Sequence, residues 1–281
     1  PNVSGLQPDL GFSQNGVTAF PSEKLNQNQK EGTSYGIVSY LKTTDKFTGQ
    51  ASVFARYSEL QYTPDVTGEL LFNGIAQAAR KTDTAFGIQL EGVYKLTSTH
   101  TIRSGLIVST DHTTSKTNSQ VFNLDADGNQ IGPAAVAIVD NSSANAQTYS
   151  AYLEDEWKLA DSLTLNYGLR FDQLDAFRHE NQLSPRVNVV WTPMEGTTVH
   201  AGYARYFSPP PFELVATESF SKFVGTSAEA PGTQNDLPRS ERDNYFDAGV
   251  QQKLGGLTLG ADAYYKKAKN LIDEGQFGAP I

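Results

Sequence analysis

Apolar and polar side chains alternate along several stretches of the chain, most regularly from Leu163 to Asp172. Successive side chains of an extended strand point to opposite faces, so Leu163, Leu165 and Leu169 share one face. Arg170 and Asp172 lie on the other face, and a packed soluble core does not accept unpaired charges. An apolar outer face and a charged inner face are typical of a barrel that spans a membrane.

About ten stretches show this alternation and predict strands. They are residues 33–42, 49–62, 82–96, 99–110, 148–159, 163–172, 186–192, 197–206, 244–254 and 257–266. Short turns are expected near residues 45, 98, 161, 193–196 and 255–256, and long polar loops over residues 63–81, 113–147, 177–184 and 208–242. Short turns at one end and long loops at the other are typical of outer-membrane barrels. We therefore expect an all-β, antiparallel transmembrane β-barrel fold, seen as an open curved sheet or partial barrel of about ten strands from a larger barrel.

The alternation also predicts which side chains face lipid. The convex, lipid-facing set is Phe86, Ile88, Leu90, Leu163, Leu165, Leu169, Leu257 and Leu259. The concave, inward set is Glu91, Lys95, Arg170, Asp172 and Asp262. Asp155 breaks the pattern because it falls on the lipid side, so we expect it to lie near an interface or to be paired locally.

Composition narrows the class of protein. The hydrophobic content of 38% and mean hydropathy of -0.42 suit a soluble protein, but also a barrel in which only alternate strand residues meet lipid. Soluble propellers, jelly rolls and β-helices stay open as alternatives, although tyrosine and tryptophan near strand ends favour a membrane. The net charge of -9 argues against nucleic-acid binding, and the absence of cysteine excludes disulfides and thiol chemistry.

Five segments in the second half of the chain carry a resemblance to a known family. They read YLEDEWKL at 152–159, LTLNYGLRFD at 163–172, SPR at 184–186, VHAGYARYF at 199–207 before three prolines, and RSERDNYFDAGV at 239–250. Their order and spacing resemble the barrel of TonB-dependent outer-membrane receptors.

This resemblance implies import of a scarce nutrient across the bacterial outer membrane, energised through TonB. Family members close a barrel of roughly 22 strands around an N-terminal plug. We recognise no plug or TonB-binding segment here, and the chain ends in what looks like a loop. Residues 1–281 are therefore expected to be part of a single barrel domain, with the plug and the C-terminal strands absent. Expected partners are outer-membrane lipid, the TonB complex through the missing plug region, and a small-molecule ligand such as a siderophore-like chelate, cobalamin or a carbohydrate.

Ligand contacts are expected on the loop at 208–242 and on inward residues below it. Exposed aromatic side chains on a long loop suggest contact with a ligand, and inward arginines could contribute charge. The alternative is that these aromatics pack the loop against its neighbours or lipid headgroups. The candidate ligand-binding residues are Tyr206, Phe207, Phe212, Phe220, Phe223, Arg170 and Arg186.

The residues suggest neither catalysis nor a cofactor. The segment 125–129 is similar to the start of a calcium loop, but lacks the later acidic ligands and reads better as a hairpin turn. The four histidines show no zinc spacing, and Glu154 and Glu156 are explained as lumen lining. We therefore expect no enzyme activity and no metal. A passive porin-like channel or structural outer-membrane barrel is the alternative function. An outer-membrane barrel hydrolase is a third possibility, but it would need a Ser/His constellation that we do not find in the sequence.

Overall fold

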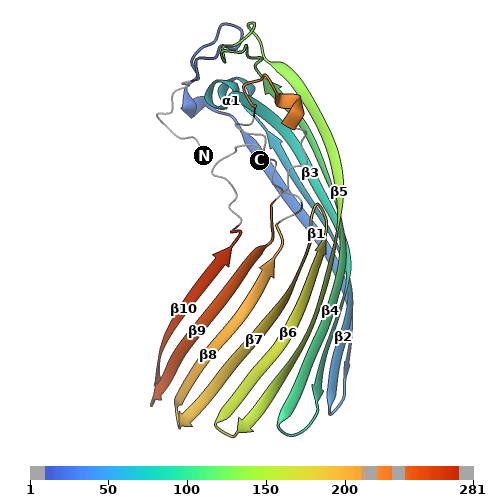
Figure 1. The fold of residues 1–281 in the computed structure, drawn as a ribbon, viewed down its shortest axis with the longest axis vertical. Helices are drawn as coiled ribbons and strands as arrows, with labels where there is room; N and C mark the ends of the chain where they lie inside the picture. Colours follow the sequence, from blue (N-terminus) through green and yellow to red (C-terminus); the bar gives the residue numbers. More distant parts are fainter. Residues whose placement is uncertain (1–9, 211, 213–219, 230–237, 272–281) are drawn as a thin grey trace.

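The chain forms one open antiparallel sheet of ten strands in a computed structural model that describes residues 10–210, 212, 220–229 and 238–271 (Figure 1). Each strand pairs with the next one along the sequence. The strands are β1 (Asn28–Thr43), β2 (Phe47–Thr63), β3 (Ile75–Lys95), β4 (His100–Val121), β5 (Val136–Ala160), β6 (Leu163–Asp175), β7 (His179–Met194), β8 (Thr197–Ser208), β9 (Glu241–Leu254) and β10 (Leu257–Lys269). The predicted all-β, antiparallel fold is confirmed.

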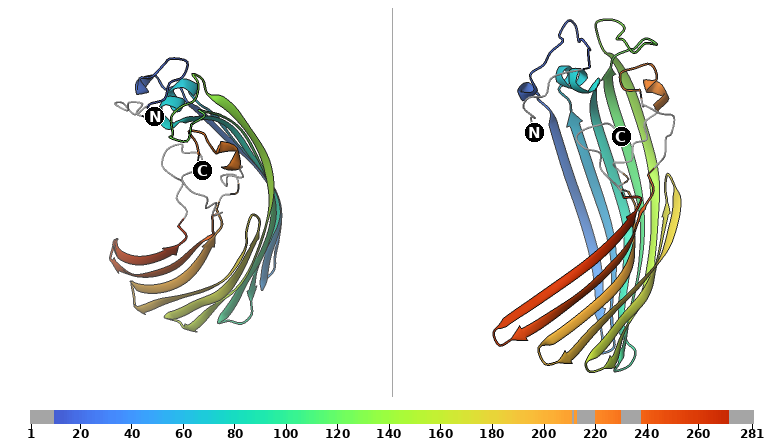
Figure 2. Two further views of the ribbon diagram at one scale, coloured as in Figure 1. Left: turned by 45° about the horizontal axis from the view of Figure 1, so that its top comes forward. Right: turned by 60° about the vertical axis from the view of Figure 1, so that its left-hand side comes forward.

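The sheet curves into an arc that stays open between β1 and β10 (Figure 2). This is the open curved sheet expected for part of a larger barrel. Within the described residues, the short helices η1 (Ser22–Lys24), α1 (Val66–Asn73) and η3 (Phe220–Phe223) lie at one end of the sheet. In the part of the chain that the structure describes, none of the helices is long and apolar enough to cross a membrane.

The connections are longer at one end of the sheet than at the other, as expected, with one exception: only residues 176–178 join β6 to β7 at the long-loop end. At the short-turn end, two to four residues join consecutive strands. At the other end, three of the four predicted loops are wrong in extent. Most of 113–147 belongs to β4 and β5, most of 63–81 belongs to α1 and β3, and β7 begins at His179 within 177–184. Residues 209–240 remain a long connection between β8 and β9.

The extra length of β4 and β5 lies beyond the region where apolar residues alternate. There Thr113 and Ser115 point to one face, and Thr114 and Lys116 point to the other. Both faces are polar because a strand outside the membrane meets water on its outer face as well as its inner face. The loss of alternation made paired strands look like loop.

The helix η3 identifies the concave face, because it lies inside the arc (Figure 2). Its Phe223 packs against Ile75 of β3 and Val121 of β4. Counting by twos along these two strands, which pair without interruption, places Glu91 and Arg103 on the same face. Directly opposed residues of an antiparallel pair share a face, so the pairing extends this assignment across the sheet.

All eight residues predicted to face lipid lie on the convex face, and the five predicted inward residues lie on the concave face. We call the convex-facing side chains of β2–β10, in the part of each strand where apolar residues alternate, the apolar belt. It comprises alternate residues within 47–57, 86–94, 102–110, 149–157, 163–171, 183–191, 199–203, 246–250 and 257–265. Phe86 is 57% exposed and Leu169 is 51% exposed, so no second sheet covers them. A soluble sandwich would bury these side chains.

Asp155 is the one charged residue of the apolar belt, and it is paired as predicted. His100 Nδ1 lies 2.7 Å from Asp155 Oδ2, and the Tyr167 hydroxyl donates to the same oxygen at 3.1 Å. The His100 ring stacks on Trp157 with 5.3 Å between ring centroids. Local partners therefore satisfy Oδ2 of this carboxylate, whereas its Oδ1 is buried without a hydrogen-bond partner.

Four segments at the long-loop end pack together into what we call the cap, made of residues 10–27, 64–74, 122–135 and 220–229. Its centre is a fully buried cluster in which Leu70 and Phe122 of the cap pack with Ala76 of β3. Ser227 joins two of the segments, because its hydroxyl accepts from Phe122 N at 2.9 Å and its own N–H donates to Phe122 O at 2.8 Å. The cap is thus a small packed core outside the apolar belt.

Local sequence signals shape the elements of the cap. The Asp65 carboxylate caps α1 by accepting from Gly68 N at 3.0 Å, and Gly74 ends the helix with a φ of 75°. At the tip between β4 and β5, Asp125 accepts from the N–H groups of Asp127 and Asn129 at 2.9 and 2.8 Å. These bonds, with that from the Asn129 amide, lower the pKa of Asp125. The predicted hairpin turn is confirmed, because the Asp125 carboxylate accepts its hydrogen bonds from the residues of this turn.

Candidate functional site

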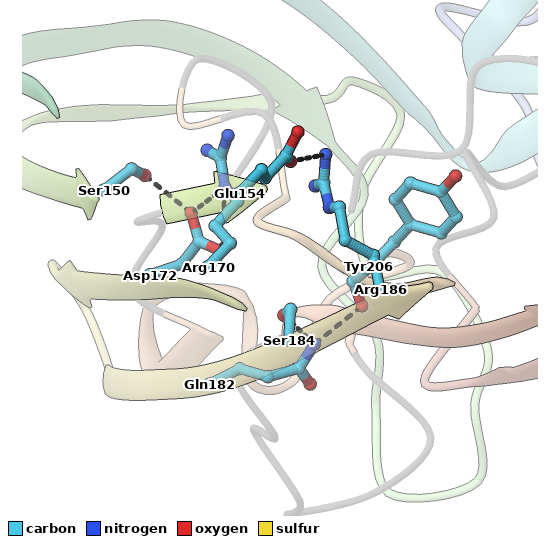
Figure 3. A network of polar contacts seen from close by, with 8 residues as sticks. All are labelled: Ser150, Glu154, Arg170, Asp172, Gln182, Ser184, Arg186 and Tyr206. Carbon is cyan, nitrogen blue, oxygen red and sulfur yellow. Dashed lines mark hydrogen bonds and ion pairs between the residues drawn. The ribbon is translucent and has the colours of Figure 1, made fainter. Parts of the chain in front are cut away.

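Polar side chains from β5 and β6 form a bonded network on the concave face (Figure 3). Arg170 Nε donates to both carboxylate oxygens of Asp172, at 2.8 and 3.1 Å. The Ser150 hydroxyl donates to Asp172 Oδ1 at 2.6 Å. Asp172 is buried, so these two donor groups, which make three contacts with it, compensate for its lost hydration. Arg170 lines the lumen as predicted, but it is already paired with a carboxylate.

The network continues onto β7 and β8. Arg186 Nη1 lies 2.8 Å from Glu154 Oε1, which joins β7 to β5 across the curve of the sheet. The Gln182 amide donates to Ser184 Oγ and to the Tyr206 carbonyl, both at 2.9 Å. Figure 3 shows Tyr206 and Arg186 beside each other, with Glu154 reaching toward the guanidinium group. These contacts hold the charged and amide side chains of the concave face in place, and we call this part of the face the wall.

A hollow of about 210 Å³ opens in this wall. Its concave-face lining combines charges of both signs, amides and one aromatic ring. The lining residues that point inward are Glu154, Asn166, Arg186, Asn188, Gly202, Ala204, Tyr206 and Asp247. Concave sites with a few well-placed polar groups are typical of small-molecule binding.

Two glycines make room for the side chains around the hollow. A Cβ at Gly202 would lie 2.7 Å from Asp247 Oδ1, and a Cβ at Gly168 would lie 2.5 Å from Glu154 Cγ. Real Cβ atoms do not approach that closely, so any larger residue would displace Asp247 or Glu154. Gly168 in β6 directly opposes Glu154 of β5, and Gly202 in β8 directly opposes Asp247 of β9. Close approach across the ladder is their structural role.

Tyr206 and Phe207 are neighbours in sequence but lie on opposite faces. Tyr206 points into the lumen and is 45% exposed. Phe207 opposes Arg242 on the convex face, where the guanidinium lies 5.4 Å from the centre of its ring. The prediction of Phe207 as a lumen or loop contact is therefore wrong. Tyr203 faces outward on the same strand, and counting by twos from it places Phe207 on the same convex face.

Two of the three loop phenylalanines, Phe223 and Phe212, have different surroundings. Phe223 is 5% exposed and belongs to the core of the cap, because it packs against Ile75 and Val121. Its role as a ligand contact is corrected to packing, which was the stated alternative. Phe212 meets Phe177 edge-on at 6.3 Å. Phe220 begins η3, and its side chain lies outside the described part of the chain.

Residues outside the predicted site also line this wall. Asp247 and Asn188 border the hollow, and Tyr245 lies edge-on to Tyr206 with 6.3 Å between ring centroids. Alternation alone shows which face a residue occupies. Its neighbours across the sheet follow from strand register, which one sequence does not reveal.

The fold and its two faces define a class: the wall of a membrane-spanning β-barrel, apolar outside and polar inside. The family model described as TonB-dependent receptor-like, β-barrel, matches residues 2–280. The chain therefore belongs to the TonB-dependent receptor family of outer-membrane transporters. The family resemblance seen in the second half of the sequence is confirmed and extends over nearly the whole chain.

Individual relatives agree with this assignment. The TonB-dependent transporter Oar of Myxococcus xanthus is 28% identical over 100 residues, covering 31% of this chain and 9% of Oar. The ferric yersiniabactin uptake receptor FyuA of Yersinia pestis has a similar fold, with a TM-score of 0.66, 14% identity and coverage of 88% of this chain and 38% of FyuA. The siderophore receptor PiuA of Acinetobacter baumannii has a TM-score of 0.55, 17% identity and coverage of 84% and 40%. The chain thus spans well under half the length of these relatives.

Proposed function

We propose that this chain forms part of the barrel wall of an outer-membrane receptor that binds a small-molecule nutrient and imports it with energy delivered through TonB. The observation that carries the proposal is the contrast between the two faces of one sheet. The convex face is an apolar belt suited to lipid, whereas the concave face holds a polar wall with a hollow of about 210 Å³. A water-filled or ligand-filled lumen explains this contrast.

Membership of the family supports active rather than passive transport. In this proposal the long-loop end, with the cap, faces the outside of the cell, and the short turns face the periplasm. The Arg186–Glu154 pair and the amides of the hollow would contact ligand inside the barrel. A passive channel with the same wall is the competing function.

Two measurements on the full-length protein that contains this chain separate these functions. We expect the purified protein to bind the periplasmic domain of TonB in a calorimetric titration and to keep a planar bilayer closed to ions. A control protein should be a general porin of the same host, which conducts and does not bind TonB. Steady ion conductance without TonB binding would replace the receptor by a passive channel.

A further inference from the structure

Three tyrosine side chains cross β8, β9 and β10 on the concave face, and we call them the tyrosine strip. The Tyr245 ring lies edge-on to Tyr206, with 6.3 Å between centroids, and nearly parallel to Tyr264, at 5.7 Å and 15°. Tyr206 is 45% exposed and Tyr264 is 74% exposed. Aromatic rings on a lumen wall therefore present their faces or edges to whatever occupies the lumen. A wall that only lined a water-filled lumen would not need these aromatic rings.

Carboxylates surround the tyrosine strip. Asp247 opposes Tyr264 directly across β9 and β10, and Asp262 lies two residues from Tyr264 on the same face. His200 Nε2 lies between these two acids, 3.2 Å from Asp262 Oδ1 and 3.7 Å from Asp247 Oδ2. The Asp262 side chain is 71% exposed. At least one carboxylate is thus available to a ligand beside the rings.

The balance of charge on this part of the wall is negative. Lys266 Nζ lies 2.8 Å from Glu241 Oε1 and 2.8 Å from Asp243 Oδ2, so one ammonium group serves two acids. On the concave face of β8–β10, within the described residues, four carboxylates accompany two lysines and one histidine. An anionic ligand would be repelled here, whereas a cation would be attracted.

The tyrosine strip is continuous with the hollow, because Tyr206 belongs to both and Asp247, which lines the hollow, opposes Tyr264. A cation held against a tyrosine face within about 6 Å of the ring centre gains from the ring quadrupole. A nearby carboxylate adds a charge-assisted contact to the same cation. Aromatic rings, an exposed carboxylate and a hollow are together the chemistry that recognises an organic cation.

We propose that the tyrosine strip, with Asp247 and Asp262, binds an organic cation: a small molecule that carries an ammonium or guanidinium group. This inference rests on the proposed function of the lumen as a ligand path, and it names the class of ligand. Aromatic rings beside acids also suit sugar rings. The excess of carboxylates over cations on the wall favours the positively charged ligand.

The test compares choline with 3,3-dimethyl-1-butanol, which has the same shape without the charge, on the full-length protein in detergent. Saturation-transfer NMR titrations should show choline binding at least about tenfold tighter than the neutral probe, with an affinity that falls as salt rises. Tyr264→Leu and Asp262→Asn should each weaken choline between about twofold and about thirtyfold. Two lumen-facing variants serve as controls.

The first control is Tyr35→Leu. Tyr35 opposes Arg56 across β1 and β2, which places it on the concave face far from the strip in strand order, and it is 79% exposed. The second control is Glu91→Gln on β3. Both controls should keep wild-type choline affinity. Near-ultraviolet circular dichroism of each variant checks that the sheet has formed, so that lost binding reflects the strip.

Three results would overturn the cation proposal: equal affinity for choline and the neutral probe, tighter binding of maltotriose than of choline, or no choline binding at millimolar concentration. TonB binding and bilayer closure are measured separately on the same protein. Loss of the cation result with TonB binding intact would leave the receptor function standing. Loss of TonB binding with choline binding intact would contradict the receptor function and leave the cation site standing.

Discussion

The apolar belt and the cap place apolar side chains under opposite rules. In the belt, Leu153 is 58% exposed and Phe86 is 57% exposed, on a face that no protein covers. In the cap, Leu70 and Phe122 are fully buried between loop segments. The same residue types therefore point away from protein in one region and into it in the other. The difference follows from the solvent, which is lipid around the belt and water around the cap.

The convex face of a single strand changes from apolar to polar where it leaves the belt. On β5, convex-facing positions are Tyr149, Ala151 and Leu153 in the belt, but Asn141 and Ser143 above it. The strand geometry does not change between the two levels, and the pairing with β4 continues without a break. Only the medium outside the sheet changes. One strand thus records the position of the membrane boundary.

The largest expected effect tests whether the cap is a true core. Phe122→Ala should destabilise the cap by about 3–5 kcal/mol, because it removes a fully buried ring between α1 and the tip of β4. Hydrogen exchange of cap amides in the full-length protein measures this loss. Val224→Ala, at a side chain that is 67% exposed, is the control and should stay within about 0.5 kcal/mol. Equal effects would mean that the cap is not packed in solution.

The next effect tests the belt. Leu153→Arg should cost about 2–4 kcal/mol of folding free energy in a bilayer, because it places a charge in the middle of the lipid-facing stretch of β5. Ser143→Arg, ten residues earlier on the same face of the same strand, should cost less than about 0.5 kcal/mol. Urea titrations of the full-length protein in lipid vesicles provide the comparison. Similar costs at both positions would argue that the boundary between lipid and water is drawn wrongly.

The smallest effect concerns a buried acid in the cap. Glu69 is 5% exposed, and burial raises its pKa above 4.5 although Tyr62 donates to it at 2.6 Å. Because the folded pKa is raised, cap stability should fall as pH rises from 4.5 through the raised value, and should recover on acidification. Glu69→Gln keeps an acceptor and removes the charge. It should therefore abolish this pH dependence.

Hydrogen exchange of α1, corrected for the intrinsic exchange rate at each pH, measures this dependence. The wild-type cap should open more readily at neutral pH than near pH 4.5, while Glu69→Gln should show a flat profile. The exposed substitution Glu23→Gln in η1 is the control and should leave the wild-type profile unchanged. A flat wild-type profile would mean that Glu69 does not make the stability of the cap depend on pH.

Alternation in the sequence was enough to predict ten strands at the level of the apolar belt and the facing of the eight convex and five concave residues assigned from it. It worked because lipid on one side imposes a period of two that no turn or loop imitates. Asp155 was equally predictable, since a charge in lipid requires a partner. The upper parts of β4 and β5 could not be predicted in this way, because both of their faces are polar.

The candidate site was predicted only in part. Tyr206, Arg170 and Arg186 lie on the concave wall, but the pairing of each arginine with a carboxylate depends on register between strands. Phe223 was misread because its burial arises from packing between segments about 100 residues apart in sequence. Phe207 differs, since counting by twos from Tyr203 would have placed it outward.

The bonds between Phe122 and Ser227 have a consequence for the order of assembly. They join residues 105 positions apart, and the strands from β5 to β8 lie between them in sequence. Closing such a long loop costs entropy that is recovered only after the intervening strands have found their register. The cap should therefore form after the sheet, and a protease-resistant cap would be a reporter of completed strand pairing. A single shifted strand would leave the cap unformed and its phenylalanines open to water.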